Sequence, residues 1–197
     1  MRKLLILVWL LVPVVGAAYH YGPGQGLLVL DDAASLIAKA ERHAAAEEWA
    51  DAVEAYGLAL EILPAEEVDL ARRAQLERAK AQMFVSELPT AHRDLQGLVE
   101  DLKADATAHP ALLADARDAL ANAQYYMTWL MRREGRGEER WKPEIEAARQ
   151  TYRLLAEEAD ARGDEAAAQK HREDLEAAIR LARMELSDLQ GLPLPSQ

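Results

Sequence analysis

Five histidines are the side chains of this 197-residue chain best suited to bind a metal or to transfer a proton near neutral pH. No two of them have the i, i+4 spacing with which two imidazoles on one helix face hold one ion; they stand at His20, His43, His92, His109 and His171. Paired carboxylates such as Glu47 and Glu48 fall on helix faces that we expect to be exposed, where solvation explains them better than acid–base catalysis. We therefore predict no catalytic residues, no cofactor and no metal site.

The residues required for nucleophilic catalysis are also missing from the sequence. It contains no cysteine, which excludes thiolate catalysis, thiolate metal sites and disulfides. No serine stands in a Gly-x-Ser-x-Gly context. With a formal net charge of −11, the chain has the wrong sign to bind a nucleic-acid backbone or anionic lipid. We expect a binding protein and not an enzyme.

One candidate binding feature is a stripe of basic and apolar residues. Arg73, Leu76, Lys80 and Met83 recur at spacings of three and four, which places them along one side of a helix. Leu76 and Met83 could equally belong to the core. As a partner-binding stripe, the set predicts an extended partner segment with an acidic residue near Arg73 and Lys80.

The second candidate is an aromatic helix, NAQYYMTWLMRR, from Asn122 to Arg133. Tyr125 and Trp129 share one face, while Tyr126 lies on the neighbouring one. One face should be core. The other is either core as well, or a recognition or dimer surface.

These side chains must be positioned by helices. Half of the residues are hydrophobic but only 6% are aromatic, alanine is abundant and β-branched runs are scarce after the first thirty residues, which favours helices over strands. Caps and helix-stopping glycines and prolines predict seven helices, over about 31–46, 46–64, 66–85, 86–106, 110–133, 143–163 and 164–189. Their short joints predict antiparallel neighbours.

The stretch AEEWADAVEAYGLALEILP, Ala46 to Pro64, has small and aromatic residues where a core helix normally carries leucine. Its order Trp49, Ala52, Tyr56, Ala59, Pro64 resembles the second helix of a tetratricopeptide repeat. Small side chains at Ala52 and Ala59 would allow a neighbouring helix to approach closely, with Tyr56 filling the gap one turn away.

The preceding helix offers Leu36 and Ala40 in matching places, although Ala40 and His43 replace the usual glycine and tyrosine of the repeat. The resemblance covers residues 33–160 and is strong only for 36–64. The resemblance implies an all-α fold: antiparallel helical hairpins stacked as a short tetratricopeptide-like solenoid, closed by a long C-terminal helix. A plain antiparallel helical bundle is the alternative.

The N-terminus carries an export or anchoring signal. Arg2 and Lys3 precede an uninterrupted apolar run of 15 residues, Leu4 to Ala18. We favour a retained transmembrane anchor over residues 1–19, and a cleaved signal peptide is the alternative. A glycine-rich tether over residues 20–30 follows, then the helical domain over 31–189 and an extended, proline-containing tail over 190–197.

Two functions of different class follow. Resemblance to tetratricopeptide proteins implies a membrane-tethered, extracytoplasmic scaffold that binds a protein or peptide, such as a component of a membrane complex. The alternative is a secreted or periplasmic all-helical small-molecule binder or enzyme. The candidate partner-binding residues are Arg73, Leu76, Lys80, Met83, Tyr125 and Trp129.

Overall fold

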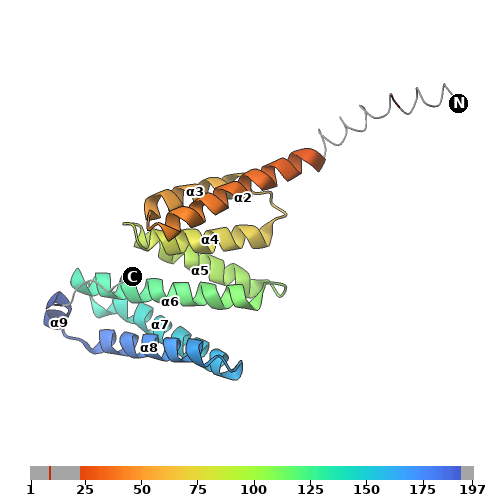
Figure 1. Cartoon of the computed structure of the whole chain (residues 1–197). Helices are drawn as coiled ribbons and strands as arrows, with labels where there is room; N and C mark the ends of the chain where they lie inside the picture. Colours follow the sequence, from red (N-terminus) through yellow and green to blue (C-terminus); the bar gives the residue numbers. More distant parts are fainter. Residues whose placement is uncertain (1–8, 10–22, 192–197) are drawn as a thin grey trace. The chain divides into compact units, whose positions relative to one another are not determined.

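The computed structural model describes Trp9 and residues 23–191, and over that part the chain is a succession of helices without strands (Figure 1). The helices are α2 (Pro23–Ala45), α3 (Trp49–Ile62), α4 (Val68–Gln82), α5 (Leu88–Ala104), α6 (Pro110–Arg133), α7 (Glu138–Ala161), α8 (Glu165–Arg183) and α9 (Leu186–Gly191). The predicted all-α class is confirmed. The chain forms two compact units, one ending at Ala74 and one beginning at Gln75, so that α4 contributes residues to both.

In the first unit, α2 and α3 form an antiparallel hairpin. The buried residues of α3 are Ala52, Ala55, Tyr56 and Ala59, and Ala52 and Ala59 are fully buried. On α2, Ala40 is fully buried as well. The expectation that small residues occupy the inward face of this helix pair is therefore confirmed. Methyl side chains allow two helix axes to approach more closely than leucines would.

Helix α2 begins earlier than the sequence suggested. Residues 23–30, which we expected in a tether before a cap at Asp31, belong to the helix. Pro23 is its first residue, a position that tolerates proline because the first backbone N–H groups of a helix have no intrahelical partner. Asp31 is an exposed residue inside α2 and does not cap it.

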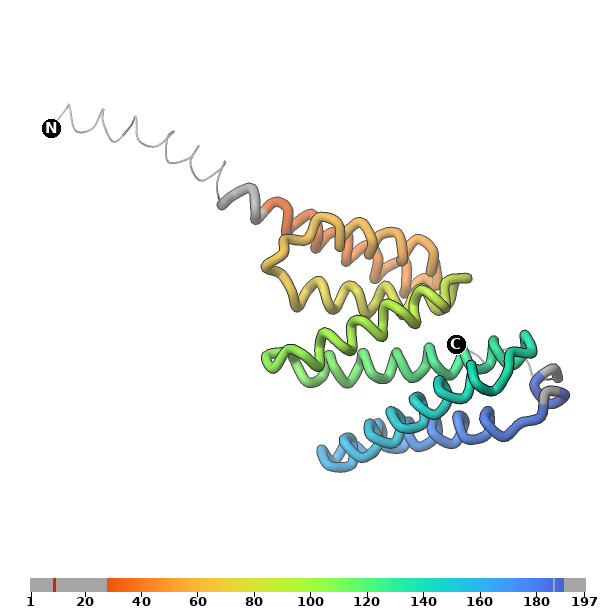
Figure 2. The backbone as a smooth tube through the Cα atoms, turned by 180° about the vertical axis from the view of Figure 1, so that it is seen from behind, coloured from red at the N-terminus to blue at the C-terminus, as the bar shows by residue number. Residues whose placement is uncertain are grey.

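The second unit has two hydrophobic clusters that meet at α6. Leu76 of α4 and Leu95 of α5 pack with one set of α6 residues, which includes Ala116. A second set, which includes Trp129, packs with α7, α8 and α9. Successive helices from α5 to α8 pack as antiparallel neighbours (Figure 2). Helix α6 thus lies at the centre of this unit, with core on two sides.

The expected start of the sixth predicted helix at Pro143 is wrong. Helix α7 begins at Glu138, and Pro143 lies inside it. A proline in this position removes one backbone hydrogen bond. Trp141 supplies the compensation, because it is 93% buried in the second cluster and carries the guanidinium of Arg132 at 4.7 Å from its ring centroid.

The long C-terminal helix expected to reach Leu189 is also wrong. Helix α8 starts as predicted, with the Asp164 carboxylate accepting a hydrogen bond of 3.0 Å from the backbone N–H of Ala167. It ends at Arg183, and the short α9 then packs against α6, with Leu189 fully buried.

The side chain of Arg132 on α6 explains where α8 ends. Its two terminal nitrogens donate hydrogen bonds to the carbonyl oxygens of Leu181 and Met184. Carbonyls of a last helical turn lack intrahelical partners, so a guanidinium that binds two of them stabilises the stop. Met184 is extended and directs the chain into α9.

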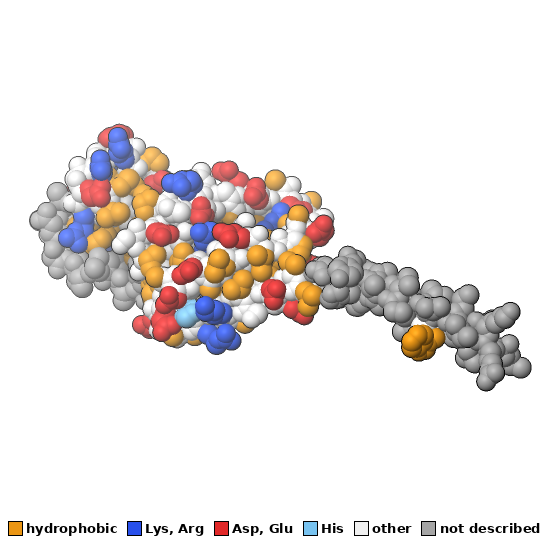
Figure 3. Space-filling view, turned by 90° about the horizontal axis from the view of Figure 1, so that it is seen from above, with side chains coloured by type: hydrophobic (Ala, Val, Ile, Leu, Met, Phe, Trp, Pro, Cys, Tyr) orange, Lys and Arg blue, Asp and Glu red, His pale blue; other side chains and the backbone are white. Residues whose placement is uncertain are grey.

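The surface carries single exposed apolar side chains among charged ones, as the face in Figure 3 shows. Those in the helices are Leu28, Val29, Leu58, Ile62, Val68, Phe84 and Leu154. No helix of the described residues is long and apolar enough to cross a bilayer. The candidate anchor over Leu4–Ala18 lies outside the described residues apart from Trp9, and most of the predicted tail lies outside them too.

Candidate functional site

A pocket of about 320 Å³ opens between the C-terminal end of α4 and one face of α6. It lies wholly within the second unit. The residues from α6 recur at spacings of three and four, which places them on one helix face. The lining residues are Lys80, Met83, Phe84, Asp115, Asp118, Ala119, Asn122 and Tyr126. We call it the α4–α6 pocket.

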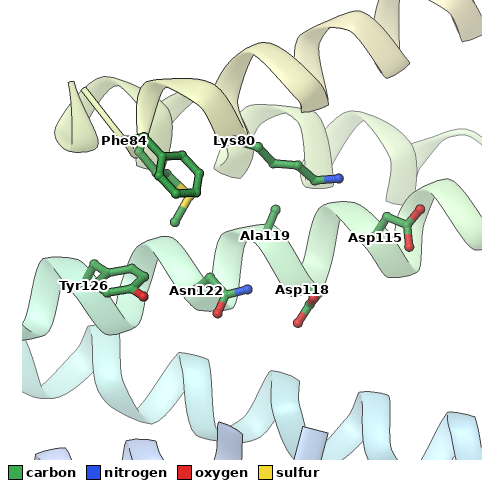
Figure 4. Close-up of a pocket in the computed structure, with 8 residues that line it drawn as sticks. Lys80, Phe84, Asp115, Asp118, Ala119, Asn122 and Tyr126 are labelled. Carbon is green, nitrogen blue, oxygen red and sulfur yellow. The ribbon is translucent and has the colours of Figure 1, made fainter. Parts of the chain in front are cut away.

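The two ends of the α4–α6 pocket differ in chemistry. Phe84 and Tyr126 lie at one end, and Lys80 and Asp115 at the other (Figure 4). Phe84 is 37% exposed, although most aromatic side chains of this chain are inside the helix packing. The pocket therefore offers an apolar wall beside a charged rim.

The charges at the rim are acidic in balance. The ammonium of Lys80 already donates to Glu77 Oε1, at 2.7 Å. The Asp118 carboxylate accepts a hydrogen bond of 3.0 Å from Lys170 on α8. Asp115 is exposed, and within residues 23–191 no side chain forms an ion pair with it. Asp115 is consequently the carboxylate most available to a bound group.

Asp118 also belongs to a polar cluster with Lys170, His171 and Asp174 of α8. His171 Nδ1 lies 3.6 Å from Asp118 Oδ1 and 3.8 Å from Asp174 Oδ2. One histidine and two carboxylates at such distances resemble a ligand set for a divalent metal. The ammonium of Lys170, however, lies 3.0 Å from Asp118 and 3.3 Å from Asp174. The polar cluster thus already has its cation.

The same geometry appears in the electrostatics of Lys170. Burial alone would lower the pKa of its ammonium, but the hydrogen bond and charge of Asp118, together with those of Asp174, outweigh burial and raise that pKa. Lys170 remains protonated beside both carboxylates. We regard the polar cluster as an ion-paired support for Asp118, and the absence of a metal site stays a prediction.

Tyrosines next to the pocket are held in their neutral form. The Tyr152 hydroxyl of α7 donates to Asn122 Oδ1 at 3.0 Å, and burial raises the pKa of Tyr152 strongly. Burial, the neighbouring Tyr125 and the charge of Asp174 raise the pKa of Tyr126. Tyr126 is therefore a neutral phenol at neutral pH and can donate a hydrogen bond to a ligand.

The residues of the predicted stripe are separated by the structure. Lys80 and Met83 line the α4–α6 pocket, whereas Leu76 is buried in the core beneath it. Arg73 is exposed and belongs to the first unit, outside the pocket. Of the four residues, only two lie at the candidate site.

The aromatic helix is mainly core. Trp129 is 92% buried in the second cluster, and Tyr125 packs against the same cluster. The guanidinium of Arg133 lies 4.8 Å from the centroid of the Trp129 ring. Tyr126 is the aromatic residue of this helix that reaches the pocket. Trp129 is thus a structural residue.

Sequence reasoning missed most of the pocket wall. The spacing of Asp115, Asp118, Asn122 and Tyr126 on one face of α6 was readable, but nothing in the sequence indicated that this face meets α4. Phe84, the only phenylalanine of the chain, gave a weaker signal.

Interactions between alternate helices divide the second unit into two layers. Asp118 on α6 binds Lys170 on α8, so α6 and α8 lie on one side together with the pocket-lining end of α4. On α5, His92 binds Glu144 of α7 at 3.0 Å. The pocket opens in the α4, α6 and α8 layer.

Comparison with known proteins identifies no relative: no protein-family model and no curated protein matches this chain.

Proposed function

We propose that this chain is a membrane-tethered scaffold that binds part of a partner protein in the α4–α6 pocket. The observation that carries the proposal is the pocket itself, in which the partly exposed Phe84 forms an apolar wall next to a charged rim. An exposed aromatic residue beside polar groups is typical of protein-binding sites. No nucleophile and base in the pocket form a hydrogen-bonded pair within the described residues, which supports binding in preference to catalysis.

The arrangement of helices supports a tetratricopeptide-like interpretation. In such repeats, first helices line a groove and second helices form the outer layer, and here the pocket lies in a layer of alternate helices, α4, α6 and α8. The small buried residues Ala52 and Ala59 in α3 agree with the same repeat. The irregular spacing of the later helices makes this a divergent relative of the repeat at most.

Tethering rests on the sequence. Arg2, Lys3 and the apolar run over Leu4–Ala18 would hold the chain in the membrane with its basic flank inside, leaving the helical units outside the cytoplasm. The partner would then be another protein of the same membrane or of the space beyond it.

A second candidate function is a small-molecule binder. The pocket volume of about 320 Å³ lies at the lower limit of ligand pockets. Asn122 and Tyr126 could orient a small polar ligand there.

The test compares two exposed apolar residues of the second unit. Phe84 lines the pocket and is 37% exposed, while Leu154 on α7 lies outside the lining and is 40% exposed. Tagged full-length protein is purified from detergent-solubilised native membranes, and co-purifying proteins are quantified for the wild type, Phe84→Glu and Leu154→Glu. Circular dichroism checks that both variants remain folded.

We expect the same partner with the wild type and Leu154→Glu, and at least a tenfold loss with Phe84→Glu, because a carboxylate in an apolar contact remains without a counter-charge. Equal recovery with both variants, or no protein enriched with the wild type, would contradict the proposal.

A further inference from the structure

We propose that the segment bound in the α4–α6 pocket carries a basic residue, arginine or lysine, beside an apolar residue. The inference rests on the proposed function and specifies the chemistry of its partner. The basic side chain would reach Asp115, and the apolar side chain would contact Phe84 and Tyr126.

Charge complementarity is the first argument. The only lysine that lines the pocket, Lys80, is bound to Glu77 at 2.7 Å. Asp118 is bound to Lys170, so its charge is largely compensated. Asp115 is exposed, and no ion pair within residues 23–191 compensates it. A chain with a formal net charge of −11 adds a negative field around this rim, which attracts cations and repels acidic segments.

The distribution of apolar groups is the second argument. Phe84 and Tyr126 lie at the end of the pocket opposite to Lys80 and Asp115 (Figure 4). A ligand that fills both ends must therefore combine a cationic and an apolar group, which two neighbouring residues of an extended segment provide. Arginine suits the cationic position well, because its planar guanidinium pairs with a carboxylate through two hydrogen bonds and stacks on aromatic rings.

This conclusion reverses the expectation from the stripe of Arg73, Leu76, Lys80 and Met83. That expectation required two basic residues acting together on an acidic partner residue. Arg73 lies outside the pocket, and Lys80 is already paired with Glu77. The acidic residue Asp115, on another helix, takes the place of the missing basic pair.

The test uses a random heptapeptide library displayed on phage and the full-length chain immobilised in mild detergent. Selected sequences are synthesised with a fluorescent label, and their dissociation constants are measured by fluorescence anisotropy at low and high salt. Three variants are compared with the wild type. Asp115→Asn removes the rim charge, Phe84→Glu removes the apolar wall, and Asp94→Asn removes an exposed carboxylate of α5 as the matched control.

We expect enriched peptides with arginine or lysine next to an apolar residue. Asp115→Asn should weaken their binding about 3- to 10-fold and reduce its salt dependence, whereas Asp94→Asn should leave both unchanged. Substituting glutamate for the basic residue of the peptide should abolish binding to the wild type.

Two results would overturn the inference, and they differ in what they say about the scaffold. Acidic or uncharged peptides whose binding is lost with Phe84→Glu but not with Asp115→Asn would refute the basic partner and leave the pocket as a protein-binding site. No enrichment on the wild type would also refute it, and the comparison of Phe84→Glu with Leu154→Glu would then decide separately whether the scaffold proposal stands.

Discussion

Arg132 and Arg133 are adjacent residues at the end of α6, and substituting each of them separates two contributions to stability. Both lie over a tryptophan ring, Arg132 at 4.7 Å from the centroid of Trp141 and Arg133 at 4.8 Å from that of Trp129. Both stand in the last turn of the helix, where a cation interacts favourably with the helix dipole. Only Arg132 also donates hydrogen bonds to the carbonyl oxygens of Leu181 and another residue at the end of α8.

The expected magnitudes follow from this difference. A hydrogen bond from a charged group contributes about 1.5–3 kcal/mol, and a cation–π contact at a partly exposed site about 0.5–1 kcal/mol. Because Arg132 is only partly buried, we take the lower part of the range and expect Arg132→Ala to destabilise the second unit by about 2–4 kcal/mol. Arg133→Ala loses the ring contact alone, so we expect about 0.5–1 kcal/mol.

Thermal unfolding followed by circular dichroism measures the global effect. For a chain of this size, Arg132→Ala should lower Tm by about 5–10 °C and Arg133→Ala by less than about 3 °C. Hydrogen exchange of the backbone over residues 185–191 measures the local effect, because α9 follows the carbonyls that Arg132 binds. Exchange there should accelerate in Arg132→Ala and remain unchanged in Arg133→Ala.

Arg132→Lys provides a further control. Lysine retains the charge but cannot bind two carbonyls in the forked geometry of a guanidinium, so its stability should lie between the wild type and Arg132→Ala. Equal losses for Arg132→Ala and Arg133→Ala, or full stability of Arg132→Lys, would refute the reasoning, since the helix dipole and charge would then account for the whole effect.

Three other predictions concern packing, acid stability and the N-terminus. Ala52→Leu should overpack the α2–α3 contact and cost about 1–3 kcal/mol in urea unfolding, while Ala50→Leu on the exposed face should cost almost nothing, and similar losses at both would contradict close helix packing. The hydrogen bond from His92 is the main cause that holds the pKa of Glu144 below its ordinary value of 4.5, so the stability from this pair is present above about pH 4.5 and is lost as the pH falls further. Glu144→Gln should therefore show a smaller decrease in Tm between about pH 5 and pH 3, and an unchanged decrease would show that other groups cause the acid sensitivity. If residues 4–18 remain as an anchor, mass spectrometry should find the intact N-terminus in a membrane fraction that resists carbonate extraction, whereas a soluble protein beginning near residue 18 or 19 would indicate cleavage.

Local signals in the sequence determined where most helices begin and end. Pro110 and Arg133 bound α6 as expected, because a proline starts a helix where its missing N–H is not needed. Asp164 caps α8 through the backbone N–H of Ala167, three residues further on. The burial of Ala52 was also readable, since it depends on periodicity within one helix. Caps and periodicity involve residues within a few positions of each other, and the sequence states those relations directly.

Relations between distant residues were decided only by the tertiary structure. Arg132 ends α8 by binding carbonyls about fifty residues further along the chain, although nothing near Arg183 predicts a stop. Pro143 lies inside α7 because Trp141, two residues earlier, is buried against other helices. The α4–α6 pocket likewise depends on which face of α6 meets α4, and side-chain packing in three dimensions chooses between faces that local propensity leaves equivalent. The sequence could therefore specify the helices, but not which of their side chains form a site.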